Sequence, residues 1–286
     1  MTGILRLLPL VLGAEGEAEK QPSVSEAVFG HVTDSKTLDL PFLGELKLPT
    51  WNVDIAGHVV DVGFTRHIVW MLIASAVLVI VAWAAARGHR KSLVPKGLSN
   101  VFETLVLFVR DEIALKTMDE HTAHTYLPYL LTAFFFIIFS AGLGIIPYAA
   151  TSVGNLAVTG TLAVLTFVLM QVVGIAHQGL GGYFLHLVPS GVPWWMFPLM
   201  WPIELLGMFT KAFALCIRLF ANMIAGHIVI LFILGLVFLL HTPLVGIASV
   251  PFAVALFLLE VIIILIQAYI FTMLSALFIG MSAHAH

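Results

Sequence analysis

Long apolar runs separated by short polar stretches dominate the chain after residue 66. A helix needs about 20 apolar residues to cross a bilayer. Five runs meet or approach that length: 68–86, 126–149 (ending at Pro147), 156–176, Pro202 to Leu240 and Pro251 to Met281. The pattern therefore predicts an all-α polytopic membrane protein with about five membrane helices.

The last two runs are too long for helices that cross a membrane upright. As continuous helices they would measure roughly 58 Å and 46 Å, against a hydrocarbon core of ~30 Å. Each run is therefore either a hairpin or one long tilted helix. The isolated glycines Gly207, Gly226 and Gly235 have no neighbouring proline, so they do not supply hairpin turns. We predict two long, strongly tilted helices.

A different pattern occupies residues 97–117, where apolar residues recur at positions 101, 105, 109 and 113. Charged residues also occur in this segment, among them Glu103, Arg110, Asp111 and Lys116. Asn100 followed by Glu103 resembles a capping box at the start of a helix. This spacing predicts an amphipathic helix at the membrane interface, with a short soluble helix as the alternative.

The charge distribution predicts the orientation of the chain. Residues 1–66 mix polar and apolar positions and predict an N-terminal extramembrane segment, in which residues 1–18 fit a short signal peptide. Residues 67–286 form the predicted membrane domain. Basic residues follow the first span directly: Arg87, Arg90, Lys91 and Lys96. Because basic loops stay cytoplasmic, we expect the N-terminus outside a bacterial-type inner membrane and the C-terminus in the cytoplasm. Residues 177–193 are then a cytoplasmic Gly-rich loop.

The composition limits which kinds of binding site the chain can contain. The chain is 60% hydrophobic and 10% charged, whereas soluble domains carry about 25% charged residues. The lone cysteine, Cys216, excludes an intramolecular disulfide and a multi-cysteine metal site. No phosphate-cradling Gly-rich motif with its lysine occurs. We therefore expect no nucleotide site and no cofactor.

Residues 121–286 hold only four formally charged side chains: Glu204, Lys211, Arg218 and Glu260. An ionisable residue at mid-membrane costs about 2.5–3.5 kcal/mol on insertion scales, and such residues mark ion pathways. At 100° per residue, Glu204, Lys211 and Arg218 share one helical face with Asn222. Lys211 can alternatively snorkel to the cytoplasmic surface, but Arg218 lies too near the middle of its run. Because arginine stays protonated, it supplies a fixed charge and does not relay protons.

A second polar set lies nearer the outer side. His227 is half a turn from Arg218 on the helix, and Glu260 and Gln267 share a face of the last helix. In an antiparallel pair, Gln267 reaches the depth of Arg218, and Glu260 reaches that of His227. Histidine and buried carboxyl groups can take up and release protons. The pattern predicts two proton half-pathways separated by Arg218, with Glu204 on the cytoplasmic side. A salt network that only stabilises the bundle is the alternative.

Two stretches closely resemble subunit a of the F-type ATP synthase, the membrane stator beside the c-ring: "RLFANMIAGH" at 218–227 and "EVIIILIQAYIFTML" at 260–274. The resemblance covers roughly residues 67–282, including Glu204 and Lys211. It implies that Arg218 faces the c-ring carboxylates, with Asn222 and Gln267 as polar neighbours.

The resemblance further implies the direction of the proton path. His227 and Glu260 would line the outer half-channel, and Glu204 would lie near the cytoplasmic one. Many bacterial relatives carry the His227 and Glu260 pair in the opposite order. The implied role is a non-catalytic subunit that couples proton-motive force to ATP synthesis. Its implied partners are the c-ring, b-type subunits of the peripheral stalk and membrane lipid, with no nucleic acid.

Two other functions remain as alternatives. A secondary transporter also carries buried charges at mid-membrane, but it is built from internal repeats, and the arginine motif occurs once. An intramembrane metalloenzyme would draw its ligands from six residues: Asp119, Glu120, His121, His124, His177 and His186. The other interpretation of these six residues is that they are polar groups at the membrane interface.

Overall fold

The computed structural model describes residues 37–40, 44–49, 52–55, 58–61, 63–91, 97–146, 149–186, 193–240 and 243–283. The predicted signal peptide and the C-terminal residues 284–286 lie outside this part of the chain. The described part contains five helices long and apolar enough to span a membrane. They are α3 (Arg66–Lys91), α6 (Glu120–Gly144), α7 (Leu156–His186), α8 (Phe197–Leu239) and α9 (Pro243–Ala283). This confirms the prediction of an all-α polytopic membrane domain.

Two short antiparallel hairpins lie in the N-terminal segment, and the sequence pattern did not predict them. Strand β1 (Thr37–Leu40) pairs with β2 (Gly44–Lys47), and β3 (Asn52–Ile55) pairs with β4 (His58–Asp61). Each strand has only four residues, too few for a clear alternation of apolar and polar positions. The hairpins precede α3 and add no strand to the membrane domain.

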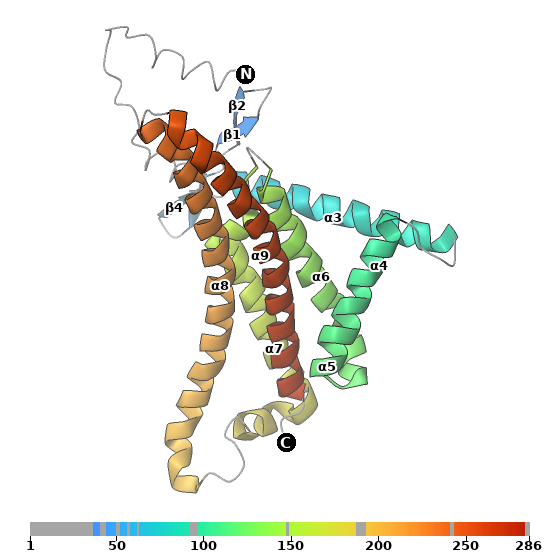
Figure 1. Ribbon diagram of the computed structural model, residues 1–286. Coiled ribbons are helices and arrows are strands. Elements are labelled where there is room, and N and C mark those ends of the chain that lie inside the picture. The colour runs from blue at the N-terminus through green and yellow to red at the C-terminus, as the bar shows by residue number, and fades with distance from the viewer. Residues whose placement is uncertain are drawn as a thin grey trace.

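The last two helices are continuous, so the hairpin alternative is wrong. Helix α8 has 43 residues and α9 has 41, which gives lengths of about 65 Å and 62 Å. They pack side by side, and Figure 1 shows α3 running across them rather than along them. The 23-residue apolar part of α3 matches the thickness of a bilayer. Helices α8 and α9 are each about twice as long as this part of α3, and their strong tilt in the membrane stays a prediction.

Several predicted helix ends were wrong. Helix α8 begins at Phe197, five residues before the predicted start, and Pro202 lies inside it. Helix α6 begins at Glu120, because Asp119 accepts a hydrogen bond from the Thr122 backbone and caps the helix six residues before the predicted start. It ends at Gly144, and Pro147 lies outside the described residues. Helix α9 begins at Pro243 and contains Pro251 in its interior. A proline does not end a membrane helix where neighbouring groups satisfy the freed carbonyl.

The predicted Gly-rich loop is helical over most of its length. Helix α7 continues through residues 177–186 and changes direction at Gly179, where φ is 72° and ψ is 162°. A side chain rarely adopts that backbone conformation, so this glycine allows the helix to kink without ending. Beyond the kink, Tyr183 folds back, and its hydroxyl donates to Gln171 Oε1 over 2.6 Å.

The predicted interfacial helix forms over residues 98–117 in three parts: α4 (Leu98–Phe108), the π-helical turn η2 (Val109–Ala114) and α5 (Leu115–Thr117). The capping box is wrong, because Gly97 with φ 62° precedes the helix and accepts from the Asn100 backbone. Val109 and Ile113 are fully buried, and η2 packs against α6 and α9. On the exposed side, the Arg110 guanidinium bonds to Asp111 and lowers the pKa of that carboxyl.

One buried stripe on each long helix sets their register. Helix α8 contributes Leu215, Leu219 and Met223 to the core, each four residues from the next. Helix α9 contributes Ile264, Ala268 and Phe271 to the same cluster. Since residues four apart lie on one helical face, the two stripes meet along a line. The polar residues that α8 and α9 bring together lie beside this apolar contact between the two helices.

Candidate functional site

His227 on α8 and Glu260 on α9 form the most deeply set ionisable pair of the described chain. The Nδ1 atom of His227 lies 2.9 Å from Oε1 of Glu260. The Glu260 side chain is 5% exposed and that of His227 is 23% exposed. Although the distance is that of an ion pair, Oε1 has no aligned hydrogen-bond donor among the described residues. The prediction that these two residues lie at the same depth is confirmed.

Asn222 and Gln267 form a second polar contact, nearer to Arg218 along α8 than the first. Asn222 Nδ2 donates to Gln267 Oε1 over 2.7 Å. Gln267 is 1% exposed, and its Nε2 has no partner in the described chain. Asn222 is four residues from Arg218, so one helical turn separates the amide pair from the guanidinium.

Arg218 is half-buried, with no ion pair or hydrogen bond to any described residue. Its helical phase places it at the border between the α9-facing stripe and the exposed apolar face of α8. That exposed face includes Phe209, Phe213 and Ile217. A permanent charge held there without a partner is costly, so the described part of the chain leaves this guanidinium uncompensated.

Glu204 and Lys211 follow Arg218 at seven-residue steps toward the N-terminal end of α8, as predicted. Both are half-buried. The Lys211 ammonium lies 5.8 Å from the ring centroid of Phe278 on α9, a distance at which a cation is attracted to the ring face. Glu204 has no hydrogen bond or ion pair within the described chain.

A small cavity adjoins His227 on the side of α3. It has a volume of about 30 Å³, and its lining includes His67, Thr151, Gly154, Ile224 and His227. His67 is 4% exposed, and its Nδ1 lies 3.0 Å from the backbone oxygen of Thr151. The cavity therefore joins the start of α3 and the turn η3 (Ser152–Gly154) to the part of α8 around His227.

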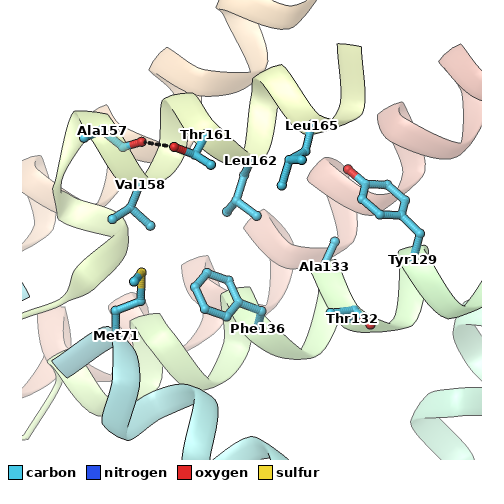
Figure 2. Close-up of a pocket in the computed structure, with 10 residues that line it drawn as sticks. All are labelled: Met71, Tyr129, Thr132, Ala133, Phe136, Ala157, Val158, Thr161, Leu162 and Leu165. Carbon is cyan, nitrogen blue, oxygen red and sulfur yellow. Dashed lines mark hydrogen bonds between the residues drawn. The ribbon is translucent and has the colours of Figure 1, made fainter. Parts of the chain in front are cut away.

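A much larger cavity, of about 460 Å³, is apolar and separate from these residues. Figure 2 shows Met71, Phe136, Val158, Leu162 and Leu165 converging on it from α3, α6 and α7. Its three hydroxyl-bearing residues already have partners: Thr161 donates to the Ala157 carbonyl, Thr132 donates to the Pro128 carbonyl, and Tyr129 bonds to Thr166. The cavity therefore offers no uncommitted polar group to an ion.

The predicted metal ligands do not gather in the described part of the chain. No group of three or more His, Cys, Asp or Glu side chains comes close enough there to hold a metal ion. Asp119 caps α6 instead, which favours the interfacial interpretation. The side chain of His186 lies outside the described residues.

The comparisons with known proteins identify the family. Residues 68–280 match the family described as ATP synthase A chain. ATP synthase subunit a of Myxococcus xanthus is 53% identical over 223 residues, covering 78% of this chain and 73% of its own. The chain belongs to the ATP synthase subunit a family. Subunit a of an Anaeromyxobacter species is 45% identical over 97% of this chain and 76% of its own, and subunit a 2 of Chlorobaculum tepidum is 45% identical over 96% and 76%.

The family match begins inside α3 and ends near the C-terminus of α9, so it spans all five membrane helices. The protein is therefore a multi-pass membrane subunit of an ATP synthase. The match includes Arg218, His227 and Glu260. It begins one residue after His67, which is not among the site residues predicted from the sequence. The only signal for that residue was a basic pair, Arg66 and His67, at the start of an apolar span.

Proposed function

We propose that this subunit carries protons through two offset half-channels beside a rotating c-ring and so couples proton-motive force to ATP synthesis. The observation that carries the proposal is the half-buried Arg218, which lacks a partner in the described chain and lies one turn from the Asn222–Gln267 pair. A carboxylate on a neighbouring subunit would complete it.

The outer half-channel ends at His227 and Glu260. Their 2.9 Å separation allows a proton to pass between the imidazole and the carboxyl group. From there a proton neutralises a ring carboxylate, which can then rotate into lipid without carrying charge. Because charge inside a hydrocarbon layer is costly, only the neutral form makes that passage.

The cytoplasmic half-channel runs past Glu204, and Lys211 adds positive charge on the same face of α8. As a ring carboxyl returns toward Arg218, the fixed guanidinium charge favours its ionised form and expels the proton. The same charge repels protons that would leak directly between the half-channels. One charge crossing 100 mV supplies about 2.3 kcal/mol, so several protons are needed for each ATP.

The exposed apolar faces of α8 and α9 support a position against other membrane proteins. Only 6% of the most apolar window of α8 is buried within the chain. We assign that face to the c-ring, and we expect b-type stalk subunits and lipid around the remaining helices. We place residues 1–66 outside a bacterial-type inner membrane and the C-terminus in the cytoplasm. The subunit itself performs no covalent catalysis in this proposal.

The decisive experiment replaces Arg218 with alanine in the assembled complex in membrane vesicles. We expect loss of both ATP-driven proton pumping and ATP synthesis, with assembly intact, because the fixed charge is gone. Arg87→Ala is the matched control, since Arg87 is exposed at the far end of α3 and stacks on Trp83. Normal coupled pumping by Arg218→Ala would overturn the proposal.

A further inference from the structure

The small cavity between α3, η3 and α8 brings one further residue, His67, close to the proposed outer half-channel. It places His67, at the start of the first membrane helix, in the same cavity wall as His227 on α8. We propose that this cavity holds water and that His67 is a proton-relay residue that delivers protons from the outside to His227. This inference rests on the proposed function, because it concerns how protons reach the His227–Glu260 pair.

The cavity has the size and the polar groups that water needs. A volume of about 30 Å³ exceeds the ~10–15 Å³ required for one water molecule. Thr151 lines it and is 4% exposed, yet its Oγ1 has no hydrogen-bond partner in the described chain. His227 uses Nδ1 toward Glu260, and its Nε2 has no partner among the described residues. A bound water satisfies both groups at once.

The hydrogen bond of His67 fixes which nitrogen accepts protons. Its Nδ1 lies 3.0 Å from the Thr151 backbone oxygen, and a carbonyl oxygen only accepts hydrogen bonds, so Nδ1 carries the hydrogen. In the neutral ring, Nε2 is then the proton acceptor. A proton from outside binds at Nε2 and leaves from the same atom to water. It passes through that water to His227, and no bond other than N–H and O–H bonds forms or breaks.

Two glycines make the close packing around Thr151 possible. A Cβ at Gly144 would lie 2.3 Å from the Thr151 Cβ, and a Cβ at Gly154 would lie 2.9 Å from its Cγ2. Because neither glycine has a side chain, the turn can pack against the end of α6 with the Thr151 carbonyl beside His67. Among the described residues that line the cavity, His67 and His227 are the titratable ones. His227 also contacts Glu260 on α9, and η3 contributes no charged residue.

The test is His67→Asn in the assembled complex, reconstituted in vesicles that synthesise ATP under an imposed proton gradient. Asparagine keeps a donor near the position of Nδ1 and can still bond to the Thr151 carbonyl, but it cannot carry a proton. We expect ATP synthesis about tenfold slower at the same gradient, a changed dependence on outside pH, and normal assembly. A wild-type rate and pH profile in His67→Asn would overturn the relay.

Thr151→Val tests the water separately, because valine keeps the shape of threonine without its hydroxyl. We expect a slower rate than in Thr151→Ser, which keeps the hydroxyl; equal rates would remove the water from the path. His227→Ala is measured alongside. A slow His227→Ala with a normal His67→Asn rejects this inference alone, whereas normal rates in both reject the proposed proton path as well.

Discussion

Gly226 lies directly against the carboxylate of Glu260. A Cβ atom at position 226 would stand 3.1 Å from Oε1 and 3.4 Å from Cδ of that residue. The same Oε1 lies 2.9 Å from Nδ1 of His227, the next residue along α8. The absence of a side chain at Gly226 therefore gives the carboxylate the room it needs to reach the imidazole.

We expect Gly226→Ala to slow ATP synthesis severalfold and Gly226→Val to slow it further. Contacts of 3.1 Å are too tight for a methyl group, so the flexible end of Glu260 must move away from His227. Gly207→Ala on the same helix is the matched control, because a Cβ there meets no atom within 4 Å. Synthesis rates in vesicles with equal amounts of complex provide the measurement. A Gly226→Val complex as fast as the control would contradict this role.

The contribution of the His227–Glu260 pair to ATP synthesis should depend on the acid–base chemistry of the two side chains rather than on their shape. Glu260→Gln keeps the size of the side chain but cannot release a proton, so we expect ATP synthesis to fall on the order of tenfold or more. His227→Ala should slow proton uptake while the complex still assembles. Proton flux at wild-type level in His227→Ala would remove it from the path.

Exchanging the two residues tests whether the pair or its order matters. The double variant His227→Glu with Glu260→His keeps one imidazole and one carboxyl group at the same site. We expect it to synthesise ATP faster than either single variant, each of which leaves two groups of the same kind. If the double variant is as slow as the singles, order as well as identity is required.

The sequence predicted which polar residues of α8 and α9 lie close together, because the spacing of these residues along each helix determines it. A seven-residue step returns to nearly the same helical face, and an antiparallel partner reverses the order of depth. Glu260 lies beside His227 as predicted, and Gln267 contacts Asn222, one turn from Arg218, whose depth it was predicted to share. Local periodicity was sufficient to predict this part of the site.

The rest of the site depends on contacts that spacing does not encode. His67 and Thr151 are 84 positions apart in the chain, and nothing in the residues between them indicates that they meet. The start of α9 was missed for another reason. The apolar pattern predicts a helix start at Pro251, yet α9 passes through it from Pro243, because a proline inside a membrane helix need not end it.

The Asn222–Gln267 contact should show energetic coupling. Asn222→Ala removes the donor and leaves the buried Gln267 oxygen without a partner, which we expect to cost about 1–3 kcal/mol. Adding Gln267→Leu replaces that buried amide with an apolar group and should recover part of the loss. Thermal unfolding of the wild type, both single variants and the double variant gives the coupling energy. Strictly additive losses would show that the contact contributes nothing.

Lys211 and Arg218 occupy the same face of α8, seven residues apart, but their surroundings differ. The Lys211 ammonium lies over the Phe278 ring of α9, whereas Arg218 has no partner in the described chain. We therefore expect Arg218→Met to abolish coupled pumping and Lys211→Met to slow it only partly, with a stability loss of about 0.5–1 kcal/mol from the lost cation–π contact. Pumping and thermal unfolding are measured on both. Because methionine fills a similar volume without charge, equal losses of pumping would mean that both cations face the rotor, and the distinction drawn from Phe278 would be wrong.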